Sequence, residues 1–212
     1  MIIVITAGGP VQELPDLALW QEADFIGVDA GTLVLLEKGI TPVAAVGDFD
    51  SVSSDELKKI SSLFPGLQLA PAEKDETDTE LALKKAMTFQ PEIVIVTGVT
   101  GGRLDHYMSA LHAIYSFQMK FPATKFLLVN RQNRIRFLSP GKHVIKRGED
   151  FRFVSFYPFA EAIRGLSLSN FKYEVLNESI PFGSTRFISN ELFSEGIVSI
   201  EEGSCIMIES RD

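Results

Sequence analysis

Short apolar runs rich in β-branched residues recur through the first part of the chain and alternate with longer, more polar segments. These runs predict strands at 1–7, 24–28, 43–46, 67–70, 93–96 and 125–129. They lack the strict polar alternation of half-exposed strands. Continuous apolar runs of this length are typical of a parallel sheet that is covered on both faces.

The segments between these strands carry apolar residues at helical spacing and predict helices at 14–20, 32–38, 53–64, 75–89 and 103–117. Thr77, with Glu80 three residues later, is typical of a capping box at a helix start. For the last helix we expect a buried face made of Leu104, Met108, Leu111 and Tyr115. Alternating strands and helices predict an α/β fold, with a doubly wound, mostly parallel sheet and helices on both faces.

The pattern changes after residue 132, where helical periodicity stops. Short apolar segments separated by turn residues predict further strands at 135–138, 143–146, 151–157, 196–200 and 205–209. The turn 201–204 predicts a hairpin between the last two segments. Regularly spaced short strands are typical of an antiparallel β-sandwich. We therefore expect two domains, an α/β domain at 1–132 and a β-sandwich at 133–212.

Composition narrows the classes of function. The chain has 212 residues, 45% of them hydrophobic, and a formal net charge of −8. This charge argues against non-specific nucleic-acid binding and favours a cationic small molecule. It does not exclude a nucleotide whose phosphates are screened by metal ions. No apolar run has the length of a membrane span, and no signal peptide is recognisable, so we expect a cytoplasmic protein without membrane contact. The only cysteine, Cys205, lies in an apolar segment and predicts a buried thiol.

Asp48 and Asp50 follow the predicted strand 43–46 and are separated by one residue. In an extended backbone their side chains point the same way, and in open α/β sheets ligands bind at the carboxyl ends of the strands. Two like charges held close raise each other's pKa unless a cation lies between them. Carboxylate oxygens suit Mg²⁺, so the pair predicts a divalent-metal site. An isolated pair of this kind is more typical of a solvated acidic turn.

Other acidic and glycine-rich turns follow the same sheet edge. They comprise Asp29-Ala30-Gly31, the turn from Thr97 to Asp105, and Asp75 with Asp78 at a predicted helix start. Asp78 could simply complement the helix dipole. Several carboxylate clusters on one edge are nevertheless more than folding requires, and they favour a site for Mg²⁺ and a polyphosphate.

Gly101-Gly102-Arg103 would supply groups that bind the phosphates of such a site. Glycine lets backbone N–H groups approach a phosphate at a helix start, and arginine donates two parallel hydrogen bonds to phosphate oxygens. Asp105 and His106 follow in the first helical turn, and His106 fits either a ligand contact or an exposed surface position. In the second domain, residues 171–173 and 184–190 offer aromatic, hydroxyl and amide groups, and an aromatic face can hold a cationic ring.

The ordered set of motifs resembles the thiamine pyrophosphokinase family in its bacterial branch. The resemblance runs over nearly the whole chain and rests on the following segments: 28–31, 47–51, 75–78, 97–98, 101–106, 140–142, 171–173, 183–184 and 188–191. It implies an ATP-binding α/β domain, a thiamine-binding β-sandwich, and a homodimer with thiamine near the subunit interface. It also implies transfer of the pyrophosphoryl group of ATP to the thiamine hydroxyl, giving thiamine diphosphate and AMP.

Carried over position by position, the resemblance implies roles for individual residues. Asp48, Asp50 and Asp78 would bind Mg²⁺, and Arg103 and Asp105 would join them in catalysis. Tyr173, Ser189 and Asn190 would line the thiamine pocket. The nucleotide would lie along Asp29, Gly31, Asp75, Thr77, Gly101, Gly102, Arg103 and His106. Asn170, Glu174 and Phe187 depart from the family pattern around the thiamine pocket.

Other functions share parts of this pattern. A haloacid-dehalogenase-type phosphatase also uses Asp-x-Asp after a strand, although normally after the first strand rather than the third. A pyrophosphokinase acting on another alcohol, such as a pterin, would share every motif before residue 132. A non-catalytic nucleotide or thiamine sensor would need fewer carboxylates than this chain carries.

Overall fold

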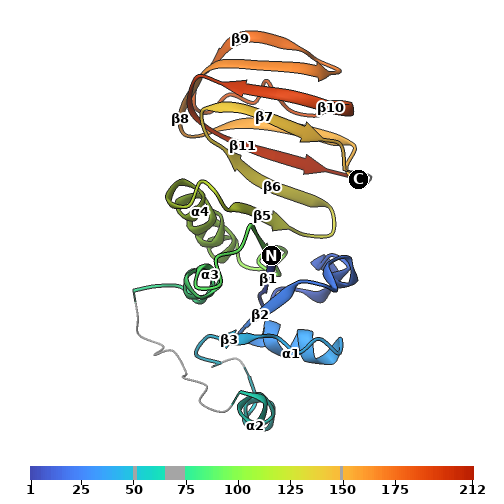
Figure 1. The fold of residues 1–212 in the computed structure, drawn as a ribbon, viewed down its shortest axis with the longest axis vertical. Helices are drawn as coiled ribbons and strands as arrows, with labels where there is room; N and C mark the ends of the chain where they lie inside the picture. Colours follow the sequence, from blue (N-terminus) through green and yellow to red (C-terminus); the bar gives the residue numbers. More distant parts are fainter. Residues whose placement is uncertain (50–51, 65–74, 149) are drawn as a thin grey trace. The chain divides into compact units, whose positions relative to one another are not determined.

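A computed structural model describes residues 1–49, 52–64, 75–148 and 150–212 (Figure 1). Within them the chain divides into two units, Met1–Arg131 and Gln132–Asp212. Asp50 and the strand predicted at 67–70 lie outside the described residues. Across the described ranges, no helix is both long and apolar enough to cross a membrane.

The described part of the first unit contains five parallel strands, each at a position where an apolar run predicts one. They are β1 (Ile2–Thr6), β2 (Asp24–Val28), β3 (Ala44–Val46), β4 (Ile93–Thr97) and β5 (Lys125–Val129). Their order in the sheet is β3-β2-β1-β4-β5, and every neighbouring pair is parallel. From β1 the chain first adds β2 and β3 on one side of the sheet, and then adds β4 and β5 on the other side. In doubly wound sheets this reversal between β1 and β4 opens a crevice at the carboxyl ends of the strands.

Helices cover both faces of this sheet. The helices are α1 (Ala30–Glu37), α2 (Ser54–Leu63), α3 (Asp78–Met87) and α4 (Leu104–Lys120). On one face Leu35 of α1 joins Val4 and Ile95 of the strands in a buried cluster. On the other face α3 and α4 contact each other, and Phe117 of α4 meets Phe126 of β5 edge-on at 6.1 Å. The predicted doubly wound arrangement is confirmed.

The buried face predicted for the last helix is wrong except at Leu111. Leu104 is 79% exposed and Met108 is 44% exposed. The residues of α4 that are buried are Ala110, Leu111, Ile114 and Phe117. This face is rotated by about a quarter turn from the predicted one at 3.6 residues per turn. Apolar residues surround most of α4, so its sequence alone does not say which stripe meets the sheet.

Two helix boundaries also differ from the predictions. The segment 14–20 contains one short 3-10 turn, η2 (Leu17–Trp20), instead of a helix, and a second such turn, η1 (Val11–Glu13), precedes it. Pro15 is the reason, because it holds the preceding residue Leu14 in an extended conformation. The helix predicted at 75–89 begins at Asp78, where the Thr77 hydroxyl oxygen accepts a hydrogen bond from Glu80 N at 3.2 Å.

The second unit contains β6 (Asn133–Leu138), β7 (Gly141–Lys146), β8 (Phe153–Phe171), β9 (Val175–Ile180), β10 (Asn190–Ile200) and β11 (Glu202–Ser210). β11 pairs antiparallel with β6 and β8, β10 antiparallel with β7, and β9 antiparallel with β8. One pair, β8 with β10, is parallel. The strands enclose a single core that includes Phe156, Ile163 and Met207. The predicted strand-rich second region is confirmed.

The predicted hairpin at 201–204 is wrong. β10 and β11 are not neighbours, because each pairs with β8 and with a different outer strand. Gly203, at φ +89°, packs so closely on β8 that a Cβ there would lie 2.3 Å from Ala162 O. The turn is therefore seated against β8. Strand β9 and the second half of β8 were missed. In β9 only Ile180 is buried, so the strand lacks the apolar run of a core strand.

Cys205 lies in β11 and is fully buried, as predicted. Burial raises the pKa of its thiol to about 12. A thiol with such a pKa is almost entirely protonated near neutral pH, and the thiolate is the reactive form. Cys205 is therefore a packing residue.

Candidate active site

The carboxyl ends of β1 to β4 meet at one edge of the sheet, because the strands are parallel. The segments that leave this edge carry six of the site residues singled out in the first unit, namely Asp29, Gly31, Asp48, Gly101, Gly102 and Arg103. These segments are 7–10 after β1, 29–31 after β2, 47–49 after β3 and 98–103 after β4. The first of them, with Gly8 and Gly9, was not assigned a role from sequence.

Asp29 fixes the turn that carries Asp48. Its backbone N–H donates to Val46 O at 3.0 Å, and its Oδ1 accepts from Phe49 N at 3.1 Å. The carboxylate passes so close to Gly47 that a Cβ there would lie 1.8 Å from Oδ1. Asp29 itself has φ 47°, a conformation that costs free energy in a residue other than glycine. The Asp29 carboxylate thus holds the β3 turn, and Gly47 is required for that contact.

The turns after β1 and β4 are pressed together at the centre of the sheet. Gly9 N donates to Gly98 O at 2.8 Å, and Ala7 N donates to Thr97 O at 2.9 Å. A Cβ on Gly98, which has φ +75°, would lie 2.1 Å from Ala7 O. Only glycine permits this approach. The Gly-Gly-Pro sequence that ends β1 was the signal that could have identified this contact.

Gly31 plays a similar part at the start of α1. A Cβ there would lie 2.1 Å from Thr6 O, so the first turn of α1 lies directly against the end of β1. This close packing places the amino end of α1 at the carboxyl end of β1. A helix amino end favours anions, because its first N–H groups have no partner within the helix.

Arg103 and Asp105 form an ion pair at the start of α4. Arg103 Nε lies 3.1 Å from Asp105 Oδ1, and both side chains are more than 60% exposed. The hydrogen bond from Arg103 is the main cause that lowers the pKa of Asp105 to about 2. The N–H of His106 also donates to Asp105, while the His106 side chain is exposed. Gly102 is open to solvent, and Gly101 lies against Glu13.

This ion pair gives a testable pH effect. Replacing Arg103 with Gln is expected to raise the pKa of Asp105 from about 2 towards its ordinary value of 3.8, because the guanidinium favours the ionised carboxylate. A lowered pKa means that the pair stabilises the fold above about pH 4 and that this contribution disappears as pH falls to about 2. Carbon NMR of the carboxyl group over pH 2–6 measures the pKa.

Arg164→Gln, which breaks the exposed pair with Glu202 at 3.2 Å, is the matched control and leaves the Asp105 titration unchanged. An Asp105 pKa that is the same in wild type and Arg103→Gln would contradict the assignment of the guanidinium as the cause.

The acidic residues before α3 are placed at that helix's amino end. Thr77 is its N-cap and Asp78 its first residue, and α3 contacts β1, β2 and β3. In the described part of the chain, no three His, Cys, Asp or Glu side chains are grouped closely enough to hold a metal ion. The predicted set of Asp48, Asp50 and Asp78 includes one residue outside that part, so it stays a prediction.

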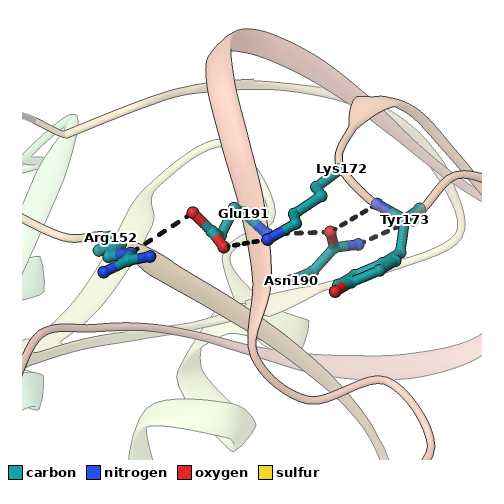
Figure 2. A network of polar contacts seen from close by, with 5 residues as sticks. All are labelled: Arg152, Lys172, Tyr173, Asn190 and Glu191. Atoms are coloured by element: carbon teal, nitrogen blue, oxygen red, sulfur yellow. Dashed lines mark hydrogen bonds and ion pairs between the residues drawn. The ribbon is translucent and has the colours of Figure 1, made fainter.

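In the second unit, Asn190 and Tyr173 are joined through the Asn190 side chain (Figure 2). Asn190 Oδ1 accepts from Tyr173 N at 2.9 Å, and Asn190 Nδ2 donates to Tyr173 O at 2.8 Å. Asn190 is only 4% exposed, whereas the Tyr173 side chain is 58% exposed. The buried Asn190 amide therefore satisfies both the N–H and the carbonyl of Tyr173, as the main chain of a neighbouring strand would. This pairing holds the Tyr173 main chain, while the aromatic ring remains exposed to solvent. Ser189 N donates to Ser155 Oγ at 3.0 Å.

Three charged residues beside this pair were not identified from sequence. Glu191 accepts from Lys172 Nζ at 2.7 Å and lies 3.4 Å from Arg152 Nε. Lys172 Nζ also lies 5.5 Å from the centre of the Tyr173 ring (Figure 2). Lys172 precedes Tyr173 in the sequence, and Glu191 follows Asn190. This adjacency to two predicted thiamine-site residues could have identified both charged residues.

Phe187, one of the departures from the family pattern, has a structural explanation. Its side chain packs against the core of the second unit, and its carbonyl accepts from Phe156 N at 2.8 Å. The Arg186 guanidinium lies 5.0 Å from the ring centre. The large residue therefore belongs to the core.

The fold and the candidate site are typical of a class of α/β enzymes in which ligands bind at the carboxyl edge of a parallel sheet, here in a chain with a second, strand-rich unit. Residues 17–126 match the family model "Thiamin pyrophosphokinase, catalytic domain", and residues 142–206 match "Thiamin pyrophosphokinase, vitamin B1 binding domain". The chain belongs to the thiamine pyrophosphokinase family.

Individual relatives agree with this membership. The chain is 43% identical to thiamine pyrophosphokinase of Bacillus subtilis (strain 168), over 99% of each chain. The crystal structure of the Bacillus subtilis enzyme has a TM-score of 0.93 and covers 100% of both chains. The crystal structure of thiamin pyrophosphokinase from Geobacillus thermodenitrificans has a TM-score of 0.90 at 40% identity, and covers 100% of this chain and 98% of that one.

Proposed function

We propose that this chain transfers the pyrophosphoryl group of ATP to the hydroxyl of thiamine, giving thiamine diphosphate and AMP. The observation that carries this proposal is the match to both family models, one catalytic and one for vitamin B1 binding, on consecutive parts of one chain. Family membership makes ATP the co-substrate and thiamine the acceptor. We place the reaction in the cytoplasm, where ATP is available.

The nucleotide site we propose is the carboxyl edge of the first unit. Asp48, Asp50 and Asp78 would hold Mg²⁺, whose preference for carboxylate oxygen fits this set. When bound, the ion supplies positive charge that screens the polyphosphate. The nucleotide would lie along the turns after β2 and β4 and the start of α3. Its neighbours there would be Asp29, Gly31, Asp75, Thr77, Gly101, Gly102, Arg103 and His106.

In the reaction, the thiamine hydroxyl oxygen forms a bond to the β-phosphorus of ATP. The bond from that phosphorus to the oxygen shared with the α-phosphorus breaks, and AMP leaves. Arg103 would donate hydrogen bonds to the phosphate oxygens, where negative charge develops in the transition state. Its ion pair with Asp105 holds the guanidinium in place at the helix start.

The hydroxyl proton must pass to a base. Asp48 and Asp105 both belong to the proposed site, and we propose that one of them takes this proton. Asp105 also orients Arg103 through their ion pair. Asp48 lies half-buried at the end of β3, in the turn that Asp29 holds.

The thiamine site we propose is formed by Tyr173, Ser189 and Asn190. An aromatic face attracts a cationic ring, and the chain's net charge of −8 also favours a cation. Asn190 would act by presenting Tyr173, since its own amide is paired with the Tyr173 main chain.

We further propose a homodimer with thiamine near the subunit interface. The second unit exposes several large apolar side chains, namely Val144, Tyr173, Leu176, Phe182, Ile188 and Phe193. A contiguous exposed apolar patch is typical of an interaction surface, and we propose that these residues contribute to one. Light scattering in solution measures the mass of the assembly.

A product assay tests the reaction. Purified protein is incubated with ATP, Mg²⁺ and thiamine, and the products are separated by chromatography. Equal amounts of AMP and thiamine diphosphate are expected. ADP or free phosphate would contradict the proposal. AMP release with a pterin alcohol but not with thiamine would assign another acceptor, and phosphate trapped on the Asp48 side chain would indicate a phosphatase.

A further inference from the structure

Lys172 places a positive charge at the Tyr173 ring. Its ammonium lies 5.5 Å from the ring centre, within the range of a cation–π contact. Lys172 N also donates to Glu191 O at 2.8 Å, which ties the main chain before Tyr173 to β10. The charge therefore has a defined place beside the aromatic face that is proposed to receive the substrate.

A fixed positive charge at this place would oppose binding of a cation. Thiamine carries a permanent positive charge on its thiazolium ring, so an unpaired Lys172 would repel it. Glu191 reduces this conflict, because its carboxylate oxygen lies 2.7 Å from Lys172 Nζ and offsets the lysine charge. Arg152 Nε lies 3.4 Å from the same carboxylate, so the three residues together carry one net positive charge, the same charge that remains when Lys172 and Glu191 are both made neutral. The Glu191 side chain is 24% exposed, so solvent screens the pair only in part.

We propose that Glu191 is a positioning residue that determines specificity for a cationic acceptor. It neutralises and holds Lys172, so that the Tyr173 ring can receive the thiazolium ring of thiamine. This inference rests on the proposed function, because it takes Tyr173 as part of the thiamine site. It goes further by assigning a role to Lys172 and Glu191, which no other observation gives them.

Glu191→Gln tests the charge, because glutamine keeps the shape and can still accept from Lys172. The dissociation constant for thiamine, measured by calorimetry, is expected to rise about fivefold, the scale of one nearby charge in a largely aqueous setting. The dissociation constant for the neutral isostere of thiamine, with thiophene in place of thiazolium, is expected to stay within about twofold. The KM for ATP is expected to stay unchanged.

A second variant separates charge from structure. Lys172→Met with Glu191→Gln removes both charges and is expected to bring the thiamine dissociation constant back to within about twofold of wild type. Glu202→Gln is the matched control, since it breaks another exposed ion pair of the second unit, with Arg164 at 3.2 Å. It is expected to leave both dissociation constants unchanged.

Three results with the Glu191 variants would overturn the inference. They are an equal loss of affinity for thiamine and its neutral isostere in Glu191→Gln, no loss for either, and no recovery in the double variant. Unchanged thiamine binding in Tyr173→Ala would overturn it as well. Failure of the proposed function looks different, because wild-type protein would then bind thiamine in the calorimeter without forming thiamine diphosphate.

Discussion

Replacing Asp48 or Asp50 with Asn is expected to lower kcat by about 100-fold or more, the scale of removing one charged contact to a transition state. Each change keeps the size of the side chain and removes its negative charge. If the carboxylates bind Mg²⁺ next to the reacting phosphates, the neutral asparagine side chains bind the ion more weakly. The transition state, in which negative charge develops on the phosphates, is then less stabilised. Steady-state kinetics with saturating ATP, thiamine and Mg²⁺ measure kcat.

Asp55→Asn is the matched control for this experiment. Asp55 lies in the first turn of α2 with its side chain 93% exposed, paired with Lys58 at 3.0 Å. It should retain the full kcat. A near-normal kcat for Asp48→Asn or Asp50→Asn at saturating Mg²⁺ would remove that residue from the metal set. Thermal melting of each variant checks that the protein remains folded.

Replacing Gly98 with Ala is expected to lower the free energy of unfolding by about 3 kcal/mol, combining left-handed backbone strain with overpacking. Gly98 has φ +75°, and a Cβ there would lie 2.1 Å from Ala7 O. The Ala7 oxygen is a main-chain atom in the turn after β1, so the overlap with a Cβ can be relieved only if the turns after β1 and β4 move apart. Urea unfolding, followed by circular dichroism, measures the change.

Gly102→Ala is the control, because a Cβ there would meet nothing within 4 Å. Its unfolding free energy should change by less than about 0.5 kcal/mol, as for most surface substitutions. Equal destabilisation by the two changes would show that contact with Ala7 is not the reason Gly98 is needed.

Most of the first unit could be predicted from its sequence. The runs 24–28 and 125–129 form strands with those same bounds, because a strand buried on both faces must be apolar throughout. Once the strands are parallel, topology alone brings their carboxyl ends together. Asp29, Gly47 and Gly98 therefore lie at one edge, as their places along the chain predict.

The candidate site was predicted less completely. The positions of Arg103 and Asp105 at a helix start followed from the local sequence, whereas their ion pair emerged only from the structure. Asn190 was expected to line a pocket, yet its amide is paired with the main chain of Tyr173. Such pairings join residues far apart in sequence, and no local pattern encodes them.

The sequence by itself determined where the strands and helices lie, which residues follow each strand, and the family to which the chain belongs. Only the tertiary structure decided which stripe of α4 is buried, how β10 and β11 are separated by β8, and that Glu191 reaches Lys172. The physical reason is the range of the interactions. Hydrophobic periodicity, caps and turn residues act within a few positions of the chain, whereas packing faces, strand neighbours and ion pairs depend on segments that meet only when the whole unit has folded.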